Sequence, residues 1–215
     1  PFTVSLDYNK NIIKRKEFIM EKSNLQKKSP CKPNLVIISG PSGVGKSTVI
    51  QILLERILCL EFAKSVSTRP PRENEKEYFF VKDKNSFLNW PGGYLEMNRY
   101  NKHFYGTPLS EIKRILKSGK TPLLDIDING FQQIQALGEY NIISFYLTAS
   151  PDLLYKRLLY RNTEPISIIL QRLSISAKEM NSPILEDYLH IIETVEEKTP
   201  EETANTIEQL LSQEL

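Results

Sequence analysis

At residues 40–47 the chain reads Gly40-Pro41-Ser42-Gly43-Val44-Gly45-Lys46-Ser47, with two glycines five positions apart followed by lysine and serine. This spacing is typical of a phosphate-binding loop, because closely spaced glycines let the backbone direct successive N–H groups at phosphate oxygens. The lysine of such a loop reaches the outer phosphates, and the serine hydroxyl ligates Mg²⁺. The sequence therefore predicts a nucleoside triphosphate site at residues 40–48, which include Lys46, Ser47 and Thr48.

The residues that flank the loop support this interpretation. An apolar run typical of a strand precedes it at residues 35–38, and apolar residues recur at helical spacing from 48 to 58. Farther along the chain, apolar runs alternate with helical patterns, which favours an α/β domain with a largely parallel sheet.

We expect strands at residues 35–39, 123–126 and 142–147, and helices at 47–58, 110–117, 130–137, 152–160, 166–180 and 200–211. The stretch from residue 78 to 105 breaks the alternation. It contains strand-like runs at 78–81 and 94–97, with a short helical piece expected around residues 91–93. This pattern indicates an inserted β-rich lobe.

Composition sets outer limits on the function. The chain has 215 residues, 40% of them hydrophobic and 25% charged, which is enough to bury a substantial core. Its net charge of +2 gives no general attraction for nucleic acid or a membrane surface, so we expect neither as a partner. Two cysteines are too few for a disulfide framework, and we expect Cys59 to be a small core residue in a reducing, cytoplasmic setting.

The first 33 residues are rich in lysine, and we predict that they form a disordered basic extension. Two interpretations remain open. Met20 would be an internal start that makes residues 1–19 an upstream extension, or the segment is a basic arm that contacts a partner.

Two arginines, Arg69 and Arg72, stand three residues apart beside the pair Pro70-Pro71, which keeps the segment out of helix. Guanidinium groups donate hydrogen bonds in pairs and stay charged, so the two would suit a second phosphate. The alternative is a solvated loop.

An acidic residue, Glu96, lies between apolar residues of an expected strand, and alternation would place Tyr94, Glu96 and Asn98 on one face. Glu96 is either a site residue or an exposed strand residue. Asp125 and Asp127 end another apolar strand, where open parallel sheets bind ligands. One of them would orient the Mg²⁺ shell, whereas Asp127 or Asn129 would otherwise cap a helix.

In their order and spacing, these motifs resemble the guanylate kinase family of P-loop nucleoside monophosphate kinases over residues 34–182. The matching segments are residues 40–47, 67–72, 77–81, 105–107 and 124–127 with Gly130. The resemblance implies an α/β P-loop NTPase domain with three layers and a central parallel sheet, spanning residues 34–215. It also implies a core at 34–64 and 108–215, a GMP-binding lobe at about 65–107, and a helical lid at about 157–172.

The resemblance further implies ATP-dependent phosphorylation of GMP and dGMP, with Mg²⁺ as cofactor. ATP would be bound by Gly40, Pro41, Ser42, Gly43, Val44, Gly45, Lys46, Ser47 and Thr48. The GMP phosphate would be bound by Arg69, Arg72, Tyr78 and Tyr105, and the guanine by Ser65, Glu96, Thr107 and Asp127. The catalytic residues would be Lys46 and the lid residues Arg157, Arg161 and Arg172. The metal would be bound by Ser47 and Asp125.

Three segments depart from the family pattern. The connection from Arg72 to Tyr78 is short and lacks a glycine, and Asn162 stands where the family tends to have glycine. Residues 189–193 replace a Val-Asn-Asp run near the adenine, which leaves the donor nucleotide open.

Two other functions remain alternatives: a binding module that uses the same fold without catalysis, and a kinase of another small phosphate ester, such as a phosphorylated ribose. We expect a monomer or a homodimer.

Overall fold

The computed structural model describes residues 34–71, 77–100, 102–161 and 165–215. The expected N-terminal extension, Arg72 and Asn162 lie outside the described residues. Among the helices in these ranges, none combines the length and apolar content needed to cross a membrane.

The centre of the fold is a five-stranded sheet in the order β2-β7-β1-β8-β9, in which every pair is parallel. Its strands are β1 (Asn34–Ser39), β2 (Leu60–Phe62), β7 (Thr121–Asp125), β8 (Asn141–Thr148) and β9 (His190–Glu193). The three strands expected from the sequence are confirmed. They are the central ones, whose continuous apolar runs are typical of strands covered on both faces.

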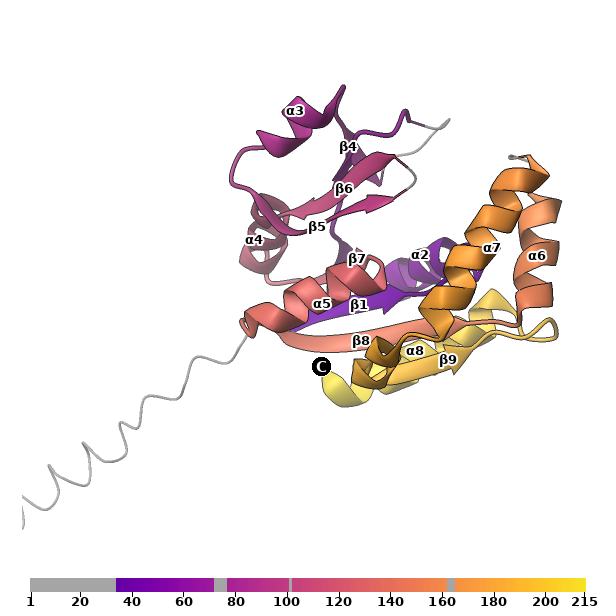
Figure 1. Ribbon diagram of the computed structural model, residues 1–215. Helices are drawn as coiled ribbons and strands as arrows, with labels where there is room; N and C mark the ends of the chain where they lie inside the picture. Colours follow the sequence, from indigo (N-terminus) through magenta and orange to yellow (C-terminus); the bar gives the residue numbers. More distant parts are fainter. Residues whose placement is uncertain (1–33, 72–76, 101, 162–164) are drawn as a thin grey trace, which may run out of the picture. The chain divides into compact units, whose positions relative to one another are not determined.

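Helices cover both faces of this sheet, as Figure 1 shows for α5 and α8. They are α2 (Lys46–Arg56), α4 (Leu109–Lys117), α5 (Ile128–Leu137), α6 (Pro151–Tyr160), α7 (Ile166–Met180) and α8 (Pro200–Glu214), with a 3-10 helix at Pro183–Asp187. Alternate residues of β1 belong to different cores: Val36 and Ile38 pack with α2, α6 and α8, whereas Leu35 and Ile37 pack with α4 and α5. The expected three-layer α/β architecture is therefore confirmed.

A second sheet is inserted between β2 and α4, in the order β4-β3-β6-β5 (Figure 1). It contains β3 (Ser65–Ser67), β4 (Tyr78–Phe80), β5 (Tyr94–Tyr100) and β6 (His103–Pro108), with the short helix α3 (Lys84–Leu88). The strands β5 and β6 form an antiparallel hairpin, and β3 pairs antiparallel with β6 and parallel with β4.

Three local expectations are wrong. The short helix lies at α3 instead of residues 91–93, because Asp83 caps it by accepting the Ser86 N–H at 2.8 Å, while Gly92 and Gly93 have positive φ and form a turn. Cys59 is exposed, because α2 ends at Arg56 and Cys59 no longer shares its buried face.

The third concerns Tyr94, which does not share a face with Glu96. A register shift between the two residues interrupts the alternation of β5. The Tyr94 ring instead stacks on Phe87 with 4.5 Å between ring centroids, and its hydroxyl donates to the Phe87 carbonyl at 2.8 Å.

The helix α8 begins with a capping box, in which the Thr199 hydroxyl accepts the Glu202 N–H at 3.2 Å and the Glu202 carboxylate accepts the Thr199 N–H at 2.7 Å. We expect Thr199→Ala to lower the free energy of unfolding by about 1 kcal/mol, measured by urea denaturation. Ser212→Ala, at the exposed far end of the same helix, serves as the control. Equal stabilities of the two variants would contradict this role of the cap.

Candidate active site

The loop at residues 40–45 joins the end of β1 to the start of α2, which is the strand, loop and helix order that the motif requires. It lies very close to β8: a Cβ atom built on Gly40 would stand 2.3 Å from the Leu147 carbonyl oxygen, and Gly40 has a φ of 147°. Both observations require glycine at this position. The first N–H groups of an α-helix have no carbonyl partner within the helix, and helix N-termini commonly bind anions for this reason.

Three basic side chains reach the loop. The Lys46 Nζ donates to the Gly40 carbonyl at 2.5 Å. Arg157 of α6 donates to the Val44 carbonyl at 2.9 Å, and Arg172 of α7 donates to the Ser42 hydroxyl at 2.8 Å. Arg161, the C-cap residue of α6, is exposed.

An acidic strand end lies beside the loop. Asp125 is the last residue of β7 and pairs in register with Ile38 of β1, so the two strands deliver the loop and the carboxylate to the same edge of the sheet. Burial and the nearby charge of Asp127 raise the pKa of Asp125, while the Lys46 ammonium opposes that shift. The Ser39 hydroxyl braces this edge by donating to the Ile126 carbonyl at 2.7 Å.

The inserted sheet holds a second acid. Glu96 is 5% exposed, and its Oε1 accepts hydrogen bonds from the Thr107 N–H at 2.9 Å and the Thr107 hydroxyl at 2.7 Å. The Ser65 and Thr107 hydroxyls are 3.2 Å apart. Burial raises the pKa of Glu96 to about 7, although the bonds from Thr107 oppose the shift. Glu96 is therefore buried, and the alternative of an exposed strand residue is wrong.

The other Glu96 oxygen, Oε2, lies against the first turn of α5. A Cβ atom on Gly130 would stand 2.9 Å from it, so only glycine leaves room for this carboxylate. Asp127 caps the same helix by accepting the Gly130 N–H at 2.9 Å, and its second oxygen accepts a hydrogen bond from the Asn98 amide. Asp127 thus caps α5 and also lines the same cavity as Glu96.

A basic and aromatic group lies on the inserted sheet, with Tyr78 on β4, Tyr105 on β6 and Arg69 just after β3. The Arg69 guanidinium stands 5.5 Å from the centre of the Tyr78 ring, and the Tyr78 and Tyr105 rings meet edge to face at 6.1 Å. Arg72, the other half of the predicted clamp, lies outside the described residues.

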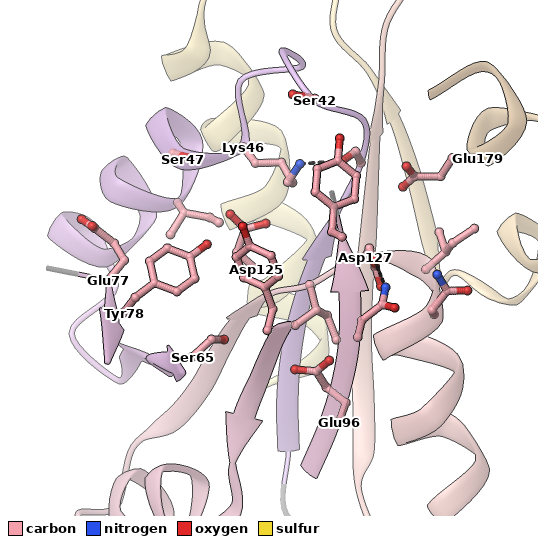
Figure 2. Close-up of a pocket in the computed structure, with 18 of the residues that line it drawn as sticks. Ser42, Lys46, Ser47, Ser65, Glu77, Tyr78, Glu96, Asp125, Asp127 and Glu179 are labelled. Atoms are coloured by element: carbon pink, nitrogen blue, oxygen red, sulfur yellow. Dashed lines mark hydrogen bonds between the residues drawn. The ribbon is translucent and has the colours of Figure 1, made fainter. Parts of the chain in front are cut away.

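Most of these groups line one cavity of about 1310 Å³, whereas Thr107, Arg157 and Arg161 are not among the residues that line it. Its wall includes Lys46, Ser47, Ser65, Arg69, Tyr78, Glu96, Tyr105, Asp125, Asp127 and Arg172. Small-molecule pockets commonly measure about 300–1,000 Å³, so this cavity has room for more than one ligand of nucleotide size. Figure 2 shows the phosphate loop with Ser42 at one end of the pocket and Glu96 at the other.

Several residues at this cavity were not assigned to the site from the sequence, although Asn98 was expected on the same face as Glu96. Asn98 and Glu179 line it, and Gln133 contacts the strand that carries Glu96. Glu179 had a signal: Arg172, Ser176 and Glu179 follow helical spacing on α7, and all three line the cavity. Burial raises the pKa of Glu179, and Lys46 opposes that shift.

Three comparisons agree on the family that this chain resembles. The family model described as guanylate kinase matches residues 32–214. The chain is 37% identical over 172 residues to the guanylate kinase of Lactobacillus acidophilus, covering 75% of this chain and 81% of that protein. It is 36% identical over 167 residues to the guanylate kinase of Helicobacter pylori, covering 76% and 81% of the two chains.

A solved structure also matches. The crystal structure of guanylate kinase from Anaplasma phagocytophilum superposes with a TM-score of 0.66 at 27% identity, covering 85% of this chain and 86% of that one.

The raised pKa of Glu96 has a consequence for stability. Because folding raises it from 4.5 to about 7, the folded chain keeps a proton that the unfolded chain releases between those values. The contribution of this proton to the free energy of unfolding is complete below pH 4.5 and is lost as the pH rises through about 7. At about 1.4 kcal/mol per pH unit, we expect the stability of the wild type relative to Glu96→Gln to fall by about 2–3 kcal/mol between about pH 5 and about pH 8. Urea denaturation at both pH values tests this, and parallel changes in the two proteins would show that Glu96 is not the group responsible.

Proposed function

Because the chain belongs to the guanylate kinase family, we propose that it transfers the terminal phosphoryl group of ATP to GMP or dGMP, which yields ADP with GDP or dGDP. The family and its relatives support nucleoside monophosphate kinase activity. The choice of guanine as the acceptor base and of ATP as the donor is our proposal.

The observation that carries the choice of guanine is the arrangement around Glu96. Guanine presents N1–H and an exocyclic amine as adjacent donors, which an ionised carboxylate accepts, whereas adenine turns an acceptor at N1 to the same group. Thr107 orients the Glu96 carboxylate through Oε1, and the glycine at position 130 leaves space beside Oε2. Ser65 and Asp127 complete the proposed guanine site.

The phosphate of GMP would lie with Arg69, Tyr78 and Tyr105, together with Arg72. The first three line the same cavity as Glu96, which supports one ligand that spans both groups. In this proposal residues 65–107 are the monophosphate-binding lobe, and residues 157–172 belong to a lid.

ATP would bind at residues 40–48. Lys46 is held by the Gly40 carbonyl at 2.5 Å and would exchange that bond for the outer phosphates. Among the described part of the chain, no three His, Cys, Asp or Glu side chains gather around one point as a metal cage. A Mg²⁺ ion that is held by few protein groups and by substrate phosphates fits this arrangement, with the oxygens of Ser47 and Asp125 as its protein ligands. When bound, such an ion neutralises charge on the phosphates.

Phosphoryl transfer requires two oxygens in line and stabilisation of the charge on the moving group. Lys46, Arg157 and Arg172 contact the phosphate loop and would supply positive charge there. Arg161, one helical turn beyond Arg157 on α6, would join them when the lid closes. Closure would exclude water, which otherwise competes with GMP for the phosphoryl group.

The proposal predicts the acceptor range of the purified protein. With Mg-ATP, we expect ADP release when GMP or dGMP is added and none above background with AMP, UMP or CMP. Lys46→Met is the control and should abolish the reaction. Silence with all five nucleotides, from a folded protein that binds ATP, would favour the binding module, and activity on a sugar phosphate alone would favour the other kinase.

Glu96→Gln tests the base site directly. An amide places a donor where guanine also donates, so we expect the KM for GMP to rise by two orders of magnitude or more while the KM for ATP stays unchanged; polar sites of this kind discriminate by as much as about 10⁴–10⁵. In the wild type, the KM for GMP should also rise as the pH falls below about 7, because protonation of Glu96 removes the ionised acceptor. Unaltered GMP kinetics in the variant would remove Glu96 from the base site.

A further inference from the structure

On the outer side of the edge strand β5, a side chain of α5 pairs with the strand backbone. An edge strand leaves backbone N–H and C=O groups on its outer side without a strand partner. At Met97 both groups meet Gln133: the Met97 N–H donates to the Gln133 Oε1 at 3.1 Å, and the Gln133 Nε2 donates to the Met97 carbonyl at 2.9 Å. Gln133 Nε2 also donates to the Asn129 carbonyl at 3.2 Å, which ties the amide to its own helix.

The residue that Gln133 holds lies between two site residues. Glu96 precedes Met97 and reaches Gly130, and Asn98 follows it and donates to Asp127. Three successive residues of β5 therefore contact the first two turns of α5. We call this contact the β5–α5 seam, which comprises Glu96, Met97, Asn98, Asp127, Gly130 and Gln133.

The seam sets the position of the two acids relative to each other. Glu96 belongs to the inserted sheet, whereas Asp127 caps a helix of the core, so the backbone alone does not fix their separation. A shift of β5 along α5 would move the Glu96 carboxylate away from Gly130 and break the Asn98 bond to Asp127. Within the seam, only Gln133 forms hydrogen bonds with both the N–H and the carbonyl of one β5 residue, Met97.

We propose that Gln133 is a positioning residue for base selection: by pairing with both backbone groups of Met97, it fixes the position of β5 along α5 and thereby the place of the Glu96 carboxylate. This inference rests on the proposed GMP kinase activity. A primary amide is needed for it, because glutamine offers an acceptor and a donor side by side, as a peptide group does.

Two substitutions separate the parts of this role. Gln133→Met keeps a similar side-chain length but loses both bonds. Gln133→Glu keeps the acceptor for the Met97 N–H and turns a second acceptor toward the Met97 carbonyl. Gln132→Met, at the exposed neighbouring glutamine of the same helix, is the matched control.

The experiment measures kcat and KM for GMP, for IMP and for ATP in the wild type and the three variants, with melting temperatures alongside. IMP retains N1–H but lacks the exocyclic amine, so it depends less on the exact place of Glu96. For Gln133→Met we expect kcat/KM for GMP to fall about tenfold through KM, as for the loss of one or two hydrogen bonds. The KM for ATP should stay within about twofold, and the preference for GMP over IMP should fall. Gln133→Glu should show the same shift, and Gln132→Met should match the wild type.

The outcomes separate the inference from the function on which it rests. A wild type that leaves GMP unphosphorylated overturns the proposed function. A wild type that phosphorylates GMP, with a preference for GMP over IMP that Gln133→Met leaves unchanged, overturns the inference. That holds even if the melting temperature falls, because a purely structural role would not alter the choice between two bases.

Discussion

The pairing of β1 with a parallel neighbour on each side is the constraint on which the site depends. Ile38 lies opposite Asp125 of β7 and Phe145 of β8, so β1 and β7 end at the same edge of the sheet, while β8 continues to Thr148. The phosphate loop leaves β1 at that edge and is pressed against the Leu147 carbonyl. A register slip of one residue would turn the alternating apolar residues of β1 to the wrong cores and separate the loop from Asp125.

From this edge, charge is distributed unevenly along the cavity. Positive groups gather at the phosphate loop, where Lys46, Arg157 and Arg172 hold backbone or hydroxyl oxygens. Toward the other end, Glu96 presents an acid whose pKa burial raises. Asp125 also lies beside the loop and Arg69 lies on the same lobe as Glu96, so each end of the cavity holds both signs of charge. The same distribution is unfavourable for the empty protein, because buried carboxylates lose hydration that the protein only partly replaces.

The sequence reveals the part of the site whose residues are contiguous. The phosphate loop and Asp125 at the end of β7 each lie within a short motif, so their chemistry can be predicted from the sequence. The strands β2, β3 and β9 contain only three or four residues, which is too few for a periodic pattern to emerge. The prediction that Tyr94 and Glu96 share a face fails because the strand register shifts between them. The contact that Gln133 makes is visible only when α5 and β5 meet, because an exposed glutamine has no distinctive sequence pattern of its own.

The helix α7 carries Arg172 near its middle and Glu179 near its end, and both face the cavity. Seven residues of helix separate them by about 10 Å along the axis. A rigid rod that tilts about its C-terminal end sweeps its distant parts through a longer arc than those near the pivot. A swing of α7 would therefore carry the arginine off the loop while the carboxylate stays almost in place. A tilt of α7 about its C-terminal end would thus change the position of Arg172 more than that of Glu179.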